Sequence, residues 1–343
     1  MRLHVAELQV GDRLSSDIYN QHGLHILSAD TVLNAEEITK LLYHEIDYVE
    51  VIPRAPSESA NIPRAQEAMP HYNEAVNGIK QLFEQAAIDG EINEKQVNGS
   101  FEPLADHFNR EKDVLSLLLT LNNKDDYTYQ HSVQVGMLAF YIAKWLKRSE
   151  SECLIAGKAG YLHDIGKSRI SDAILKKPGK LTDEEYAIIR NHTIYGYDLI
   201  MESIGDRVFA QAALQHHERL DGTGYPNRLK SHEIEPLSKI VAVADVYSAM
   251  ISTRVYQKKR DLLTVMRELD RVSFSELDPD IVQTFIRNMA PNLIGKKLVL
   301  RSGELGTVVY INPTEIFRPL IKIGDRFVDL SRERHLEIES IRV

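Results

Sequence analysis

The stretch from residue 163 to residue 226 constrains this chain most, because it gathers side chains that bind metal ions. Adjacent histidine and aspartate can ligate one ion together, or the carboxylate can bridge two ions. A lone histidine on an apolar helix face is more often a core residue than a ligand, but five of the thirteen histidines lie between residues 131 and 217. We therefore predict a metal centre built around the run His163-Asp164-Ile165-Gly166-Lys167, then His192, His216-His217 and Gly224-Tyr225-Pro226.

Charge and cysteine content narrow the class of protein. The 343 residues carry a net charge of -9, which argues against a chain that grips a nucleic acid polymer. Metal ions and a few basic residues can still make a small site attractive to an anion. The single cysteine, Cys153, excludes an internal disulfide framework and fits a reducing compartment. No signal-peptide pattern and no membrane-spanning apolar run is found in the sequence, so we expect a cytoplasmic chain without a membrane segment.

Hydrophobic periodicity divides the chain into four parts and predicts a mainly α fold. Residues 1–52 alternate in short stretches, as in a small α/β module of a regulatory type. Residues 53–94 begin as a proline-rich linker and continue as a connecting helix, whose apolar stripe could pack on the main domain or pair two copies in a homodimer. Residues 95–290 predict an all-helical bundle core. Residues 291–343 return to alternation and predict a small antiparallel β domain.

Capping boxes predict where several helices begin. One further helix, starting near His131, carries this histidine on an apolar face. The boxes are Asn34 with Glu37, Ser149 with Glu152, and Thr182 with Glu185. The second box opens a helix that runs into His163, and the third opens the helix that presents His192.

Asp245 is the strongest ligand candidate that is not a histidine. It interrupts an otherwise apolar helical run that starts at Pro236. A buried carboxylate is costly unless it is paired or bound to a cation. Asp245 therefore joins the histidines as a predicted metal ligand.

The candidate ligands divide evenly between two divalent metal ions. Mixed imidazole and carboxylate donors suit iron or manganese, and also zinc, better than magnesium or calcium. Two such ions roughly 3.5–4 Å apart can stabilise the attacking and the leaving oxygen of a phosphoryl displacement. A hydroxide shared between the two ions would attack the phosphate. We predict that Asp164 bridges the ions, with His131, His163 and Asp245 on one and His192, His216 and His217 on the other.

Basic residues near these ligands are candidates for contacting phosphate. Lys167 follows the His-Asp pair closely and is predicted to neutralise a non-bridging phosphate oxygen as charge develops. The alternative is a solvated lysine near a helix C-terminus, where a cation is mildly favoured. Arg254 and Lys258 could serve the second phosphate of a larger substrate.

The motifs HDIGK (163–167), HHERLDGTGYP (216–226) and ADVYSAM (244–250), followed by TRVY (253–256), resemble those of the HD-GYP family. These are bacterial cyclic di-GMP phosphodiesterases, a branch of the HD phosphohydrolases, and the resemblance covers about residues 125–285. It implies an all-α bundle with a binuclear metal site and cyclic di-GMP as substrate. The ring would be opened to the linear dinucleotide, with GMP as the product of a second cleavage. The resemblance further implies that Lys167 and Arg254 contact phosphates and that the loop Gly224-Tyr225-Pro226 shapes the pocket.

Two departures from the family pattern bear on these expectations. Members often have proline directly after the residue matched by Arg254, then a basic residue two positions later, where this chain has Val255 and Gln257. This difference weakens the expected substrate contacts at that edge. Members with three metals carry glutamate four residues before the first histidine ligand, where this chain has Tyr127. We therefore predict two metal ions per chain.

Two further interpretations stay open beside cyclic di-GMP hydrolysis. The metal centre recognises phosphate and not the base, so the substrate could be another cyclic dinucleotide or a mononucleotide. A catalytically silent receptor for cyclic di-GMP is the alternative from another class. Intact ligands favour an enzyme, because a receptor can lose its metal residues freely.

Overall fold

The computed structural model describes residues 2–5, 8, 11–20, 23–44, 46–52, 64–109, 127–251 and 262–342, and all structural statements below concern these residues. The chain forms two compact units. The first comprises Met1–Ile62 with Ile294–Glu339, and the second comprises Pro63–Leu293 with Ser340–Val343. The predicted four-part division and the roles of its parts stay predictions.

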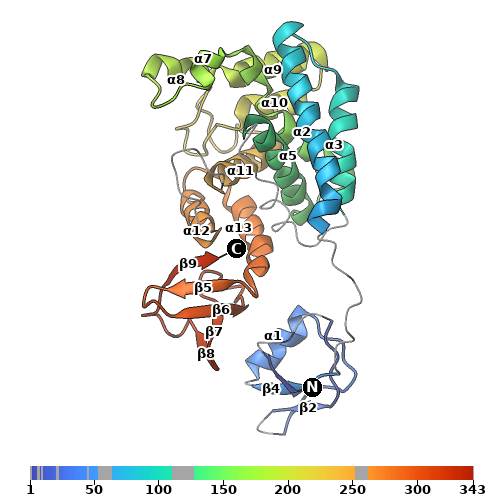
Figure 1. Cartoon of the computed structure of the whole chain (residues 1–343), viewed down its shortest axis with the longest axis vertical. Coiled ribbons are helices and arrows are strands. Elements are labelled where there is room, and N and C mark those ends of the chain that lie inside the picture. The colour runs from blue at the N-terminus through green and yellow to red at the C-terminus, as the bar shows by residue number, and fades with distance from the viewer. Residues whose placement is uncertain are drawn as a thin grey trace. The chain divides into compact units, whose positions relative to one another are not determined.

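The second unit is helical and contains every described candidate for the site. Figure 1 shows α2 and α3 alongside α5, and the same helices pack on one another and on α6. This arrangement confirms the predicted mainly α fold with a helical bundle core. The helices are α2 (Arg64–Ile88), α3 (Glu94–Phe108), α5 (Tyr127–Trp145), α6 (Glu150–Leu162), η2 (Ile165–Arg169), α7 (Asp172–Leu175), α8 (Asp183–Arg190), α9 (His192–Ser203), α10 (Arg207–Gln215), α11 (Pro236–Ile251), α12 (Leu262–Val272), α13 (Pro279–Met289) and η3 (Ala290–Leu293).

Helix α5 is the centre of this unit. Residues 130–143 are buried without interruption, whereas the sequence predicts an apolar helix with one buried face. The difference arises because α2, α6, α11 and α13 all pack against α5 and together cover its circumference. A helix enclosed in this way carries its functional polar residues inside the core.

The connecting helix α2 packs on the helical core. Its apolar stripe is buried within the chain itself, with Tyr72 3%, Ile79 0% and Phe83 7% exposed. The stripe faces α3, α5 and η2. Of the two roles predicted for it, packing on the main domain is therefore the one that the structure shows.

The predicted capping boxes are present at the starts of α1 (Ala35–Tyr43), α6 and α8. The helix predicted to present His192 is interrupted, however. Helix α8 ends at Arg190, and Asn191 donates its backbone N–H to Ile188 O at 3.1 Å before α9 begins at His192. This tight turn lets α9 start in a new direction, so that His192 occupies the first turn of its own helix.

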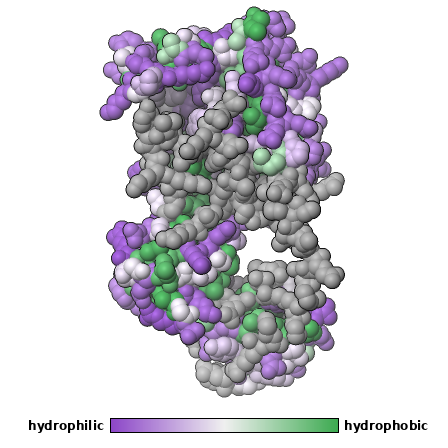
Figure 2. All heavy atoms as spheres, viewed as in Figure 1, coloured by the Kyte–Doolittle hydropathy of each residue, from purple (hydrophilic) through white to green (hydrophobic). Residues whose placement is uncertain are grey.

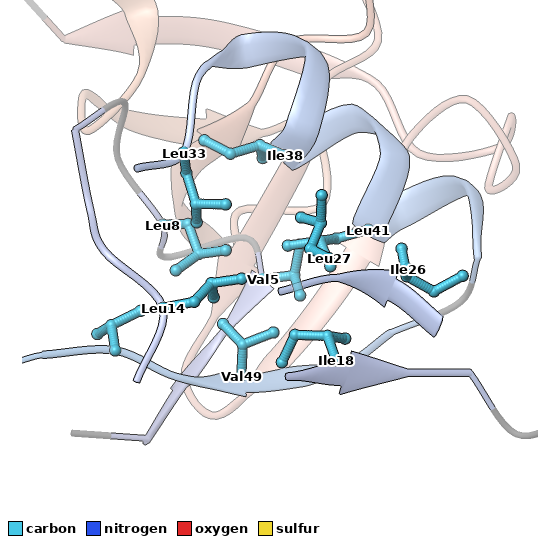
Figure 3. Packing of buried hydrophobic residues seen from close by; sticks show 11 residues of the cluster. Val5, Leu8, Leu14, Ile18, Ile26, Leu27, Leu33, Ile38, Leu41 and Val49 are labelled. Atoms are coloured by element: carbon cyan, nitrogen blue, oxygen red, sulfur yellow. The ribbon is translucent and has the colours of Figure 1, made fainter. Parts of the chain in front are cut away.

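The amino-terminal part of the first unit is a small α/β fold around an aliphatic core. Strands β1 (Arg2–His4) and β4 (Tyr48–Glu50) pair antiparallel, as do β2 (Ile18–Tyr19) and β3 (His25–Leu27). Helix α1 places Ile38 and Leu41 among the buried side chains contributed by the strands and loops, as Figure 3 shows. The observed elements match the predicted α/β pattern.

The carboxy-terminal residues form a five-stranded sheet in the order β8-β7-β6-β5-β9, which confirms the predicted β appendage. The pairs β5–β6, β6–β7 and β7–β8 are antiparallel. The sequence did not predict the edge strand β9. The strands are β5 (Lys297–Leu300), β6 (Leu305–Tyr310), β7 (Leu320–Ile323), β8 (Arg326–Asp329) and β9 (Ile338–Arg342).

Hydrophilic side chains cover most of the described surface of the helical unit on the face shown in Figure 2. Among the described helices, none has the length and apolar character needed to cross a membrane.

Candidate metal centre

All the predicted metal ligands come together inside the helical unit, in two adjoining groups. Within each group the ligand atoms lie within 4.8 Å of one another. The first group is His131, His163 and Asp245, and the second is Asp164, His192, His216 and His217. They come from α5, the end of α6, the start of α9, the end of α10 and the middle of α11. These are the two sets that the sequence assigns to separate ions, and the role of each residue as a ligand stays a prediction.

Three of the histidines are oriented by the backbone of their own helices. In each case Nδ1 lies within hydrogen-bond distance of a carbonyl oxygen one turn earlier, which fixes the proton on Nδ1 and leaves the Nε2 lone pair facing the cluster. This is the tautomer that a metal ion needs. The contacts are His163 Nδ1 to Gly160 O at 2.7 Å, His192 Nδ1 to Ile189 O at 2.6 Å, and His216 Nδ1 to Ala213 O at 2.9 Å.

His131 is oriented by side chains instead. Its Nδ1 lies 3.0 Å from Ser248 Oγ, and Ser248 donates its hydroxyl proton to Gln134 Oε1 at 3.1 Å. Ser248 therefore accepts from His131, whose Nε2 faces Asp245 Oδ1 at 3.0 Å. Sequence reasoning missed both supporting residues. The available signal was their spacing, since each follows a candidate ligand by three residues on the same helix face.

Asp164 has one oxygen directed to each group. Oδ2 is 3.3 Å from His163 Nε2, whereas Oδ1 is 3.3 Å from His192 Nε2 and 3.9 Å from His216 Nε2. The side chain is almost fully enclosed, with 1% exposed. A carboxylate divided in this way between two ligand groups suits a bridging position.

The inward-facing nitrogen and oxygen atoms are acceptors, which can bind a cation but cannot hydrogen-bond to one another. His163 Nε2 and Asp164 Oδ1 are buried and have no hydrogen-bond partner among the described residues. His192 Nε2 and His216 Nε2 face each other at 3.3 Å although each ring already carries its proton on Nδ1. Buried acceptors left facing each other are costly unless a cation or proton lies between them. The residues present therefore fit iron, manganese or zinc, the metals favoured by such a donor set.

The pKa shifts of Asp164, Asp245 and His216 agree with this fit, whereas, against the opposing effect of burial, Asp164 raises the pKa of His163. Burial alone would raise the pKa of Asp164, but the neighbouring His163 and Lys167 hold that pKa well below its usual range. Burial likewise opposes ionisation of Asp245, yet His131 and His217 lower its pKa strongly. Burial and the neighbouring imidazoles lower the pKa of His216 well below its usual value. Ionised carboxylates and a neutral imidazole are the forms that ligate metals.

Lys167 lies at the cluster and not in open solvent. Its ammonium group pairs with Asp164 Oδ2 from the short helix η2. The neighbouring Gly166 makes this position possible, because a Cβ at residue 166 would be 2.0 Å from the carbonyl oxygen of His192. Only glycine allows η2 to approach α9 so closely. The contact of Lys167 with substrate phosphate stays a prediction.

The loop after His217 folds back over the residues that precede it. A Cβ at Gly224 would be 2.4 Å from the backbone nitrogen of Arg219, so this approach also requires glycine. Next to it, the Tyr225 ring stacks on the His217 ring, with centroids 4.6 Å apart. The loop therefore touches the candidate ligands directly. Pro226 follows Tyr225 in the same loop.

Glu218 holds this loop in place and was missed by the sequence analysis. The side chain is 2% exposed and accepts two backbone hydrogen bonds, from Asn227 N at 2.7 Å and Leu229 N at 2.9 Å. Both oxygens of the carboxylate are thus used to fix the chain beyond Pro226. Its place directly after the two histidines was the only signal available in the sequence.

Replacing Glu218 by glutamine is expected to destabilise the fold by about 1–3 kcal/mol, because the amide NH₂ must face one of two backbone N–H groups. The displaced loop should also lower kcat/KM by roughly ten- to a hundredfold. Thermal unfolding and hydrolysis assays measure the two effects. Glu233→Gln is the matched control, since exposed Glu233 accepts one backbone bond from Lys230 in the same loop. Equal behaviour of the two variants would contradict the role of Glu218.

Arg254 and Lys258, the predicted contacts of a second phosphate, lie outside the described residues, as do Val255 and Gln257. Tyr127 is described and its ring stacks near that of His131, with centroids 5.9 Å apart. The described histidine, cysteine, aspartate and glutamate side chains form no third ligand group.

Known proteins share this domain. The HD domain family matches residues 116–281. The chain is 32% identical over 246 residues to a cyclic di-GMP phosphodiesterase of Pseudomonas aeruginosa, which covers 71% of this chain and 59% of the relative. It is 40% identical over 178 residues to a cyclic di-GMP phosphodiesterase of Thermotoga maritima, a match that covers 51% of this chain and 48% of the relative. It is 34% identical over 182 residues to 3′3′-cGAMP-specific phosphodiesterase 1 of Vibrio cholerae, with 52% of this chain and 42% of the relative covered. The chain thus spans about half the length of the curated relatives it matches.

Among solved structures, an HDG"Y"P protein from Bdellovibrio bacteriovorus is similar in fold. The TM-score is 0.55 at 16% identity, with 83% of this chain and 97% of that chain covered. At this level of identity the likeness supports the fold alone. The domain match and the motifs HDIGK and HHERLDGTGYP show an HD domain within residues 116–281, and the sequence relatives above are named as cyclic di-GMP or 3′3′-cGAMP phosphodiesterases.

Proposed function

We propose that this chain is a metal-dependent phosphodiesterase that hydrolyses cyclic di-GMP to the linear dinucleotide. The observation that carries the proposal is the position of Asp164, whose two oxygens face different ligand groups while Lys167 pairs with one of them. This arrangement suits a phosphoryl displacement that needs two cations and one further positive donor. Relatives named as cyclic di-GMP phosphodiesterases supply the substrate class.

Two divalent transition metal ions would be held by the two ligand groups, with Asp164 shared between them. When bound, they would supply Lewis-acid stabilisation and a nucleophile at neutral pH. The chain's own residues would position these ions. The histidines whose Nδ1 faces a backbone carbonyl keep their Nε2 atoms directed inward, and burial excludes water from competing for the Nε2 atoms.

Two side chains would act on the substrate directly. Lys167 would donate to a non-bridging phosphate oxygen, where negative charge increases during displacement. Burial raises the pKa of Tyr225 far above neutrality, so its phenol stays protonated and can donate a hydrogen bond beside His217. The substrate contacts predicted for Gly224, Pro226, Arg254 and Lys258 are part of the same proposal.

Hydrolysis of 3′3′-cGAMP is the second candidate function. The chain is 34% identical to a Vibrio cholerae enzyme named as specific for that nucleotide. The described ligand groups select for phosphate and do not distinguish guanine from adenine. A silent receptor is disfavoured because every described candidate ligand is in position.

Metal-loaded protein incubated with cyclic di-GMP, 3′3′-cGAMP, cyclic di-AMP and cyclic mononucleotides tests the substrate. We expect the highest kcat/KM on cyclic di-GMP. Failure to hydrolyse any cyclic dinucleotide, despite bound metal, would refute the proposal. Higher kcat/KM on 3′3′-cGAMP would favour the second candidate.

We also expect two metal equivalents per chain, because the described histidine, cysteine and acidic side chains form two ligand groups and position 127 carries tyrosine in place of a carboxylate. With two ions, only one phosphodiester at a time is held strongly, so the linear dinucleotide should accumulate before GMP appears. Elemental analysis of anaerobically purified protein and a product time course measure both. Three equivalents that survive Asp126→Ala, or GMP formed without an accumulating intermediate, would contradict this prediction.

A further inference from the structure

Arg190 is a cation at the edge of the candidate site that the ligand chemistry does not use. It is the last residue of α8, exposed, and two positions before His192. Its guanidinium carbon lies 4.7 Å from the centre of the Tyr186 ring and 4.9 Å from the centre of the Tyr225 ring. Two aromatic contacts on one arginine hold the side chain in one orientation.

This pair of contacts connects Arg190 to the metal ligands. The Tyr225 ring stacks on the ring of His217, a candidate ligand, and the Arg190 guanidinium lies over the same Tyr225 ring. Tyr186 precedes Arg190 by four residues on the same helix, which places both side chains on one face of α8. The cation is therefore fixed beside the loop that the Glu218 carboxylate holds in place.

Three other cations of the helical unit are paired with carboxylates. Lys167 pairs with Asp164, Lys177 lies 2.6 Å from Glu185, and Arg219 Nε lies 3.8 Å from Glu276. Among the described residues, Arg190 has neither a carboxylate partner nor a hydrogen bond from its side-chain N–H groups. Because the Tyr186 and Tyr225 rings contact the faces of the guanidinium, its in-plane N–H groups remain available to a ligand. These N–H groups can bind a phosphate through two parallel hydrogen bonds.

We propose that Arg190, held by Tyr186 and Tyr225, binds the second, non-reacting phosphodiester of a cyclic dinucleotide while the first is at the metal cluster. This inference rests on the proposed function and adds a residue that selects substrates with two phosphates. A guanine edge also offers two acceptors to an arginine, but the unpaired charge of Arg190 favours an anion.

The test compares Arg190→Ala with wild type on substrates with one and two phosphodiesters. On cyclic di-GMP, 3′3′-cGAMP and cyclic di-AMP, we expect KM to rise by about 10- to 100-fold, the usual effect of losing a hydrogen-bonded charge, with kcat much less affected. On bis(p-nitrophenyl) phosphate, which has one phosphodiester, the variant should match wild type. Arg207→Ala is the control, since Arg207 is an exposed arginine at the start of α10.

Two further variants separate charge from geometry. Arg190→Lys keeps the charge without the planar fork, so it should recover only part of the loss. Tyr186→Ala removes one of the two rings and should raise KM by about two- to fivefold. Full recovery by lysine would overturn the two-bond contact, and an unchanged KM in Tyr186→Ala would overturn the positioning by the ring.

The outcomes distinguish this inference from the proposed function. If wild type cleaves bis(p-nitrophenyl) phosphate but no cyclic dinucleotide, the proposed function fails. If wild type cleaves cyclic dinucleotides and Arg190→Ala does so with an unchanged KM, only the role of Arg190 fails. A loss confined to guanine-containing substrates would overturn the phosphate contact in favour of base recognition. An equal loss on the single-phosphate substrate would overturn it too, because the damage would then lie at the metal cluster.

Discussion

Asp164→Ala is expected to lose both metal binding and hydrolysis. Each oxygen of this buried carboxylate faces a different ligand group, so one substitution removes a ligand from both predicted ions. The remaining imidazoles of the second group would then hold a cation without any counter-charge of their own. We expect less than one metal equivalent per chain and activity at the background of the assay.

Elemental analysis, circular dichroism and hydrolysis of the same preparation measure this effect. Asp172→Ala is the matched control, because exposed Asp172 pairs with Lys176 at 2.8 Å, as Asp164 pairs with Lys167, but belongs to neither ligand group. It should keep metal and activity. Wild-type metal content and turnover in Asp164→Ala would exclude a bridging position for this residue.

Lys167→Ala is expected to keep both metals and to lose about two to three orders of magnitude in kcat, as happens when one transition-state donor is removed. Lys167 is not a metal ligand, and the ligand atoms that would hold each ion come from other residues. Its ammonium group pairs with Asp164, and its proximity to this carboxylate is the reason for predicting that it contacts a phosphate oxygen.

Metal content measured beside the rate separates the two roles that Lys167 could have. Loss of metal together with activity would mean that Lys167 serves to hold Asp164 in position. Turnover equal to wild type would mean that the ammonium group does not contact the substrate. Lys176→Ala provides the control, since this exposed lysine also pairs with an aspartate a few residues earlier in the chain.

The partners of some supporting residues could not be predicted, because they come from distant parts of the chain. The spacing of Ser248 from Asp245 places it on the ligand face of its helix, but nothing in either segment indicates its pairing with His131, 117 residues away. The contact of Arg190 with Tyr225 likewise joins α8 to a loop more than thirty residues later. Hydrogen-bond and ring partners of this kind exist only after the helices have packed.

Local pattern also misjudged two elements. The sequence predicts one apolar face for helix α5, yet residues 130–143 are all buried because α2, α3, α6, α11 and α13 pack around it. Strand β9 was missed because a strand at the edge of a sheet depends on its neighbour β5 for backbone hydrogen bonds, and its own short alternation is weak. In both cases tertiary packing, and not local preference, decided the outcome.

By itself the sequence determined the main architecture and predicted the chemistry of the candidate site. Histidine and aspartate can ligate a metal ion together, so the two groups around Asp164 could be proposed before their geometry was known. Capping boxes at Ser149 and Thr182 act within one turn, which is why the starts of α6 and α8 were predictable. Only the tertiary structure decided which atoms face inward, which carbonyls hold the imidazoles, and that Glu218 and Arg190 adjoin the cluster. The physical reason is the distance along the chain over which each effect acts. Side-chain chemistry and capping are local, whereas the orientation of side chains within a buried site depends on helices that are far apart in the chain.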